Sequence, residues 1–300
     1  MLEALGITHI CMTNDTCSRT PIETEQVIDG EEFCSKAASF TPNSSLCLVD
    51  HYGLDHTWET YVTDQLSIPI LCIDDLANRP HTVASLLDQN LYDDMDSRYE
   101  DLVSPDTQLL LGPTYALLRP EFAECRPKTP VKETIENVVV ILGGGASPCL
   151  DLIIQSLNQI KRSWNITIIA GLGASFDDEW IQKTHHHYAV IPFVENVVPL
   201  LLSADLCIGA GGSMTWERCC LGVPTLAISL SEDQIAISQR VHEAKACYYV
   251  GHITDINVSI LLSGIDQLLS SNTRQLYRDN GMNMVDGLGC RRVTKEVVFL

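Results

Sequence analysis

Two glycine-rich segments in the second half of the chain are the residues best suited to chemistry. Gly209-Ala-Gly-Gly-Ser213 and Leu142-Gly-Gly-Gly-Ala-Ser147 each follow an apolar, strand-like run. Glycine lets a backbone approach a ligand closely, and the amide N–H groups at a helix start favour a phosphate. We predict an anion site that includes Gly143, Gly144, Gly211, Gly212 and Ser213. The alternative is that each segment only connects a strand to a helix.

Two side chains near these segments extend the predicted site. Glu217 lies about one helical turn beyond Ser213 and is suited to accepting hydrogen bonds from two ribose hydroxyls. Gln234 follows another strand end, in Ser231-Glu-Asp-Gln234, and could bond a sugar hydroxyl. The alternatives are a solvated glutamate and a helix first turn with ordinary acidic residues.

The first half of the chain holds candidates for acid–base work. Asp50, His51 and Tyr52 follow a strand-like run, where Asp50 and His51 could pair and Tyr52 could donate to a ligand. A turn between strand and helix with a capping aspartate is an equal alternative. Asp74 and Asp75 follow the next run and could hold Mg²⁺, but one capping and one solvated aspartate is favoured.

Continuous apolar runs separated by helix-length segments predict buried parallel strands in an α/β fold. Helical spacing is found in residues 150–160 and 238–246. A proline-rich segment, 119–133, predicts an exposed linker, so we expect two Rossmann-like domains, 1–125 and 126–300, facing a cleft. The expected strands are 7–12, 46–50, 68–74, 86–88, 108–112, 137–143, 166–171, 189–193, 205–209 and 224–228.

The first residues do not fit the start of such a domain. Met1 to Leu5 is typical of a last helical turn that ends at Gly6, and a strand is expected directly after it. A Rossmann-like half normally begins with a strand and a glycine-rich turn. We expect a truncated reading of a longer gene, or else a half that is built differently.

Composition excludes several classes of function. The 300 residues are 45% hydrophobic and carry 39 acidic against 19 basic side chains, a formal charge of −20. No basic run is present to displace counterions from nucleic acid or to bind an anionic membrane. The 12 cysteines show no Cys-x-x-Cys spacing, so we expect buried, reduced thiols in a cytoplasmic protein. His185-His-His187 is expected in a solvated loop.

Several blocks in order resemble the UDP-sugar hydrolases of pseudaminic (nonulosonic) acid biosynthesis, with matches from Ile7 to about Val293. These hydrolases cleave a UDP-activated diacetamido-trideoxy sugar to UDP and free sugar. The matching blocks are Asp50–Asp55 with Trp58-Glu59, Ile73–Ala77 with His81, Leu86–Asn90, Gly112–Phe122, Gly209–Ser213 with Trp216–Cys220, and Asp286–Gly289.

The resemblance implies a GT-B fold with UDP bound mainly by the second domain, without a cofactor or metal. Gly212, Ser213 and Glu217 are implied at phosphate and ribose, Gly143 to Gly145 beside the diphosphate, and Phe193-Val194 beside the uracil. Tyr52 matches a site tyrosine of the family.

This sequence departs from the family at two places. The family's Gly-x-Gly-His turn, with its proposed catalytic histidine, corresponds to a segment before Met1. Asp233 stands where the family usually has asparagine, next to Gln234. The catalytic candidates are therefore Tyr52, His51 and Asp233. The alternatives are a GT-B glycosyltransferase that uses a UDP-sugar and a non-catalytic UDP-sugar-binding protein.

Overall fold

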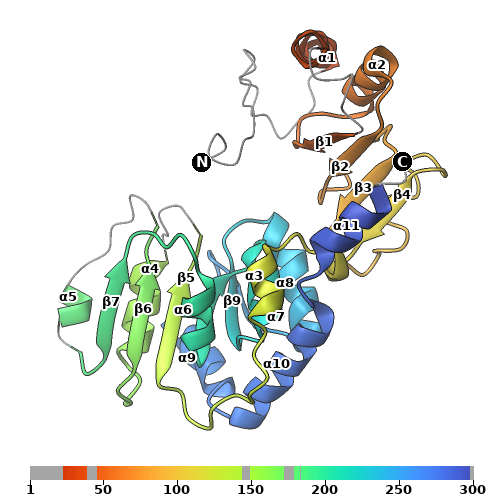
Figure 1. The fold of residues 1–300 in the computed structure, drawn as a ribbon. Coiled ribbons are helices and arrows are strands. Elements are labelled where there is room, and N and C mark those ends of the chain that lie inside the picture. Colours follow the sequence, from red (N-terminus) through yellow and green to blue (C-terminus); the bar gives the residue numbers. More distant parts are fainter. Residues whose placement is uncertain (1–22, 39–45, 144–148, 172–178, 183, 298–300) are drawn as a thin grey trace. The chain divides into compact units, whose positions relative to one another are not determined.

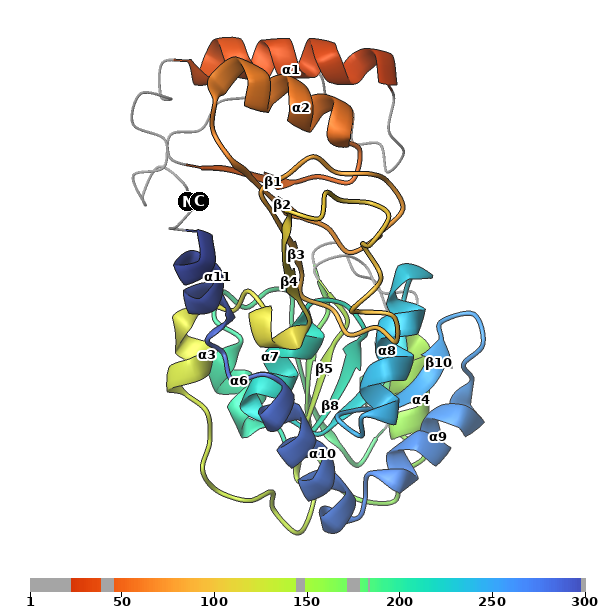
Figure 2. The same cartoon turned by 90° about the vertical axis from the view of Figure 1, so that its right-hand side faces the viewer.

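The computed structural model describes residues 23–38, 46–143, 149–171, 179–182 and 184–297. The chain forms two compact units, each with its own parallel sheet (Figures 1 and 2). The first unit takes in residues up to Asn90, Asp94–Tyr115 and Arg291–Leu300. The second takes in Leu91–Asp93 and Ala116–Cys290. The units change over at Tyr115, about ten residues before the expected boundary, and the chain end belongs to the first unit.

The described residues of the first unit form a four-stranded parallel sheet with the order β1-β2-β3-β4. Its elements are α1 (Glu23–Ala37), β1 (Cys47–Asp50), α2 (His56–Leu66), β2 (Ile70–Ile73), β3 (Ser85–Asp88), β4 (Gln108–Leu111), the 3₁₀ helix η3 (Pro113–Tyr115) and the Arg291–Val297 part of α11 (Gly289–Val297).

A single apolar core joins the first sheet to α1 and α2. The Phe33 and Trp58 rings lie 5.1 Å apart between centroids, and the Trp58 indole N–H donates to Asp29 at 2.8 Å. Val62 and Leu86 are fully buried in the same core. The helix pair therefore covers one apolar face of the sheet.

In the second unit, the part of the chain that the structure describes contains a six-stranded parallel sheet with the order β10-β9-β8-β5-β6-β7. Its elements are α3 (Pro120–Glu124), β5 (Asn137–Ile141), α4 (Leu150–Leu157), β6 (Asn165–Ile169), α5 (Glu179–Gln182), β7 (His187–Ile191), α6 (Val198–Ser203), β8 (Leu206–Ala210), α7 (Met214–Leu221), β9 (Thr225–Ser229), α8 (Asp233–Glu243), β10 (Tyr248–His252), α9 (Val258–Gln267) and α10 (Ser271–Met284).

The strand order of the second sheet indicates where a ligand would bind. The chain runs outward from β5 through β6 to β7, returns to β8 on the other side of β5, and then runs outward to β10. Helices following β5 and β8 diverge to opposite faces: α4 and α9 pack on one, α6, α7 and α8 on the other. In open parallel sheets, ligands generally bind beyond the carboxyl ends of the strands at such a reversal.

The expected parallel α/β architecture is confirmed. The nine expected strands from residue 46 onward are all present, whereas the strand expected at 7–12 lies outside the described residues, as does the helix end before it. The structure adds β10 and α1, which the sequence analysis did not predict. The prediction of an exposed linker over residues 119–133 was wrong at its start, because Phe122 of α3 is fully buried in the core of the second unit.

Most of the described cysteines pack as small apolar groups. Eight of them are buried, and burial raises the pKa of the Cys207 and Cys220 thiols to about 11. Cys125 and Cys290 are exposed. Within the described ranges, no helix combines the length and the apolar character that crossing a membrane needs.

Candidate functional site

The connection between β8 and α7, residues 211–213, is our candidate for a ligand site among the described residues of the second unit; we call it the β8–α7 turn. The amide of Gly211 still belongs to the sheet, since it donates to Ile228 at 2.9 Å. The amides of Thr215 and Trp216 bond back to Gly212 and Ser213. Within the described residues, no backbone bond uses the amides of Gly212, Ser213 or Met214.

The first turn of α7 is therefore available to an anion. Ser213 is its N-cap residue, and the Ser213 side chain is exposed and makes no capping hydrogen bond. Free amides and an uncapped helix start carry partial positive charge. This arrangement, beside the topological reversal of the sheet, is suited to binding a phosphate group.

The end of β8 and the β8–α7 turn need glycine because side chains of two helices pack directly against them. A Cβ on Gly209 would lie 2.7 Å from Nη1 of Arg218, and a Cβ on Gly211 would lie 2.0 Å from Oγ of Ser238. Neither distance is possible for real atoms. Side chains of α7 and α8 fill the space that these glycines leave open, and this packing holds the turn in place.

Two predicted side chains are brought to this turn. Glu217 is half-buried on α7, one turn beyond Ser213; burial raises the pKa of its carboxyl, while Arg218 and Arg119 oppose the rise. The amide Nε2 of Gln234 lies 3.4 Å from where a Cβ on Gly212 would stand, and its Oε1 accepts from the Leu230 amide at 3.0 Å. Asp233 is exposed in the first turn of α8.

The other predicted nucleotide residues follow β5 and β7. Gly143 comes two residues after β5, the direct neighbour of β8, and adopts φ +116° with open space where a Cβ would stand. Gly144 lies outside the described residues. Phe193 is 66% exposed and Val194 half-buried beyond β7, two strands from β5. Gly143 and the β8–α7 turn therefore both follow strands at the point where the strand order reverses. Phe193 lies farther along the same edge of the sheet.

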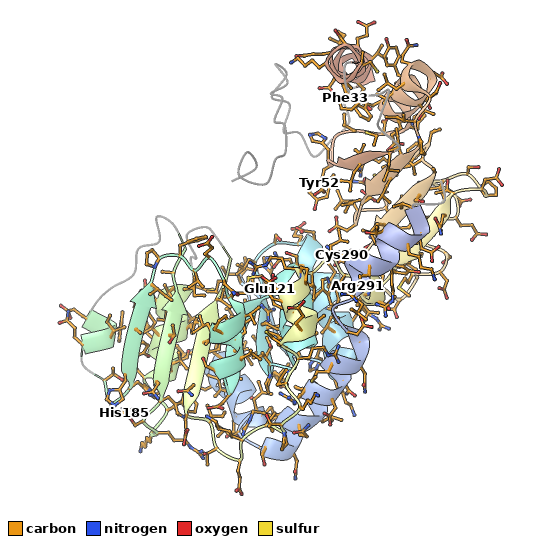
Figure 3. All side chains as sticks on the ribbon, in the orientation of Figure 1. Phe33, Tyr52, Glu121, His185, Cys290 and Arg291 are labelled. Atoms are coloured by element: carbon orange, nitrogen blue, oxygen red, sulfur yellow. The ribbon has the colours of Figure 1, made fainter. Side chains whose placement is uncertain are left out.

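In the first unit, His51 and Tyr52 follow β1 as expected, and Tyr52 extends from the loop into solvent (Figure 3). Within the described residues, no hydrogen bond joins Asp50 to His51. The His51 Nδ1 instead accepts from the Gly53 amide at 3.0 Å. The neutral ring then carries its proton on Nε2, so in this arrangement His51 presents a donor rather than a base.

Asp74 does not offer a metal site. It is 1% exposed, and its carboxylate accepts from Nη1 of Arg79 at 2.6 Å, from the Ala77 amide at 2.9 Å and from the Tyr99 hydroxyl at 3.1 Å. Arg79 also donates to the carbonyls of Leu54 and His51. The capping alternative is therefore correct for Asp74, and the Asp74–Arg79 pair holds the loop that carries Tyr52.

Asp88 shares a proton network with Asp74. The Tyr99 hydroxyl lies 3.1 Å from Asp74 and 3.0 Å from Asp88, but a phenol has one proton to donate. Burial raises the pKa of Asp88 to about 6. A protonated Asp88 can donate to the hydroxyl oxygen while the phenol donates to Asp74, which satisfies both contacts.

This network predicts a pH dependence of stability. The pKa of Asp88 rises on folding from 3.8 to about 6. Protonated Asp88 therefore adds to the free energy of unfolding below pH 3.8, and this stabilisation is lost as the pH rises through about 6. Over that interval the free energy of unfolding of the wild type should fall by about 2–3 kcal/mol relative to Asp88→Asn. Urea unfolding of both proteins across these pH values measures the difference. If the free energy of unfolding of the wild type minus that of Asp88→Asn stays constant or rises with pH, Asp88 does not have a raised pKa in the folded protein.

A buried cluster of Glu59, Cys72 and His81 could not be predicted from local sequence patterns, since the three residues come from separate segments; their ligand atoms lie within 4.8 Å of one another. His81 Nδ1 lies 2.7 Å from Oε1 of Glu59, and the Thr82 amide donates to Oε2. Burial and Glu59 raise the pKa of the Cys72 thiol far above its usual range. Both carboxylate oxygens are engaged and the thiol keeps its proton, so the cluster joins α2 to the segment before β3.

His185-His-His187 was expected in a solvated loop, but its middle residue is buried. His186 is 6% exposed; its Nδ1 accepts from the Trp164 amide at 3.2 Å, and its Nε2 lies 2.8 Å from the Leu157 carbonyl. Burial lowers the pKa of His186, which favours the neutral ring. This histidine is a structural link between α4 and β7.

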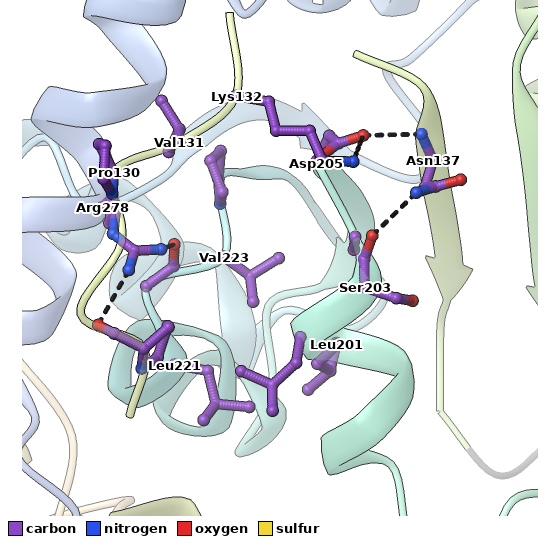
Figure 4. Close-up of a pocket in the computed structure, with 15 residues that line it drawn as sticks. Pro130, Val131, Lys132, Asn137, Leu201, Ser203, Asp205, Leu221, Val223 and Arg278 are labelled. Atoms are coloured by element: carbon purple, nitrogen blue, oxygen red, sulfur yellow. Dashed lines mark hydrogen bonds and ion pairs between the residues drawn. The ribbon is translucent and has the colours of Figure 1, made fainter. Parts of the chain in front are cut away.

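A cavity of about 250 Å³ lies at the opposite edge of the second sheet, at the amino ends of β5, β8 and β9 (Figure 4). Its charged groups are already paired. Lys132 lies 3.2 Å from Asp205, which also accepts from the amides of Glu136 and Asn137, and Arg278 donates to the carbonyls of Pro127 and Gly222. No charged group there is left to recognise a ligand, so we do not assign it a binding role.

Comparison with known proteins defines the class. Acinetobacter baumannii MurG superposes with a TM-score of 0.69 at 12% identity, covering 100% of this chain and 87% of MurG. The Neisseria meningitidis UDP-GlcNAc 2-epimerase bound to UDP-GlcNAc gives 0.58 at 11% identity, covering 100% and 88%. The fold is therefore GT-B-like.

The family follows from the sequence of the second unit. Residues 138–287, half of the chain, match the glycosyltransferase family 28 C-terminal domain, and the chain belongs to this family. The Bacillus subtilis spore coat polysaccharide biosynthesis protein SpsG is 28% identical over 171 residues. That match covers 55% of this chain and 50% of SpsG, so the chain spans about half the length of this curated relative.

Proposed function

We propose that the second unit binds the UDP part of a UDP-sugar at the β8–α7 turn. The observation that carries the proposal is the uncapped start of α7, with its free amides and the Ser213 hydroxyl, at the reversal of the sheet. In this proposal the amides hold the diphosphate, and Glu217 accepts from the ribose hydroxyls. The fold shared with an epimerase bound to UDP-GlcNAc supports a nucleotide-sugar ligand.

The proposed reaction breaks the bond between the anomeric carbon and the diphosphate. Negative charge grows on the leaving UDP, where preorganised amides and the helix dipole stabilise it. Water is the proposed acceptor, which gives UDP and free sugar, and the resemblance to UDP-sugar hydrolases supports this choice. The proposed role of Tyr52 is to orient the sugar.

Transfer to an acceptor hydroxyl is the second candidate. The match to glycosyltransferase family 28 favours it specifically. Both reactions use the same UDP site and differ only in the group that attacks the anomeric carbon. A protein that binds a UDP-sugar without cleaving it is the remaining possibility, and one experiment separates all three.

The test measures UDP binding by calorimetry and UDP release from UDP-activated acetamido sugars, with and without sugar acceptors. Release with free sugar and no acceptor supports hydrolysis, acceptor-dependent release supports transfer, and binding alone supports a non-catalytic protein. Glu217→Gln should weaken UDP binding by about tenfold, a loss of one charge-assisted hydrogen bond. Asp266→Asn, an exposed acid on α9, should leave binding unchanged. Absence of UDP binding by the wild type would refute the proposal.

A further inference from the structure

Arg218 is a buried cation beneath the β8–α7 turn. Its side chain is 1% exposed, although it lies on α7 directly after Glu217. Its Nη2 donates to the Ala210 carbonyl at 2.6 Å and contacts the Thr215 hydroxyl at 3.2 Å. The guanidinium therefore reaches back under the segment that leads into the turn.

In the part of the chain that the structure describes, no carboxylate balances this guanidinium. Among the described residues, none accepts a hydrogen bond from its Nε or Nη1, and no carboxylate oxygen lies within ion-pair distance of it. An arginine stays protonated in proteins, so it cannot lower the free-energy cost of burial by becoming neutral. A buried charge that lacks a partner is strongly destabilising unless another charge compensates it.

The surrounding chain is shaped to keep the guanidinium in place. A Cβ on Gly209 would lie 2.7 Å from Nη1 and 2.8 Å from Cζ of Arg218, so the last residues of β8 leave room for it. Glu217 is its nearest charged neighbour in sequence, but no ion pair joins the two side chains. The guanidinium is therefore buried without a carboxylate partner, in a chain whose formal charge is −20.

We propose that Arg218 is a positioning residue whose buried charge is completed by the diphosphate of the bound nucleotide, an inference that rests on the proposed UDP site. Its bond to the Ala210 carbonyl fixes the start of the β8–α7 turn. Its positive charge, transmitted through the low-dielectric interior, raises the affinity of the amides of Gly212 and Ser213 for an anion. The uncompensated guanidinium of the free protein acquires its counter-charge only when the ligand binds.

The test compares UDP with uridine, which has the same base and ribose but no phosphate. Arg218→Met should weaken UDP binding by about tenfold or more and change uridine binding by less than about twofold. Arg218→Lys keeps the charge and should retain UDP affinity within about threefold. Equal losses for UDP and uridine would reduce Arg218 to a purely structural role and overturn the inference.

A measurement on the unaltered protein covers the case in which the methionine variant does not fold. The buried Nε–H of Arg218, assigned in NMR spectra by its absence from Arg218→Lys, should shift on addition of UDP and not of uridine. A signal that does not respond to UDP overturns the inference while leaving the UDP site intact. A wild type that binds neither UDP nor uridine overturns the proposed function, and the inference with it.

Discussion

Replacing Gly211 with alanine is expected to remove UDP binding and to destabilise the second unit by about 1–3 kcal/mol. The new Cβ would stand 2.0 Å from Oγ of Ser238 on α8, so the turn or the helix must move. The backbone at Gly211 does not have a positive φ, so the effect comes from the collision alone. Chemical denaturation and UDP calorimetry measure the two losses.

Two further variants show whether the collision is the cause. Ser238→Ala removes the colliding oxygen and leaves a Cβ at 3.4 Å, an ordinary contact, so the double variant should recover most of both losses. Gly212→Ala, in the same turn, meets Gln234 at 3.4 Å and should change stability by less than about 0.5 kcal/mol. A double variant no better than Gly211→Ala would refute the explanation.

Arg79→Met is expected to destabilise the first unit by about 3–5 kcal/mol. Arg79 and Asp74 are 3% and 1% exposed, and their ion pair measures 2.6 Å. Removing the guanidinium leaves the Asp74 carboxylate buried without its cation and frees the His51 and Leu54 carbonyls. The free energy of unfolding in urea measures the loss, and increased proteolysis of the loop after β1 reports its release.

Two further variants show whether the loss of stability comes from the buried ion pair or simply from removing a charge. Combining Arg79→Met with Asp74→Asn removes both charges and should recover part of the loss, since the uncompensated carboxylate is gone. Lys36→Met breaks the partly exposed pair between Lys36 and Glu32 and should cost less than about 0.5 kcal/mol. Equal losses from Arg79→Met and Lys36→Met would show that burial of the Asp74 pair is not what matters.

The strands of both sheets could be predicted because parallel strands buried on both faces are continuous apolar runs. Val138 to Ile141 and Leu206 to Ile208 are both buried across the sheet, and both were recognised. β10 was missed because each of its residues is only half-buried and its apolar run ends at Val250, before Gly251 and His252. α1 was missed because its sequence is largely polar along its length.

The site was predictable only in part. Glycines after strand ends are visible in a sequence, and so is a glutamate one helical turn later. Arg218 was not predictable as a buried group, since an arginine beside Glu217 on a helix normally faces solvent. The contact between Gly211 and Ser238 joins residues on separate elements, and no local pattern encodes it. Such contacts depend on packing between elements far apart in the chain.

The cavity at the amino ends of β5, β8 and β9 has a consequence for how this fold can change over time. There, Lys132 with Asp205 and Arg278 with two carbonyls satisfy one another, so that edge maintains the second unit without any ligand. The groups that we propose to bind UDP are gathered at the other edge, in the loops after the strands. Mutations in those loops can alter which molecule is recognised while the internally paired edge preserves folding, which gives such a domain room to diversify.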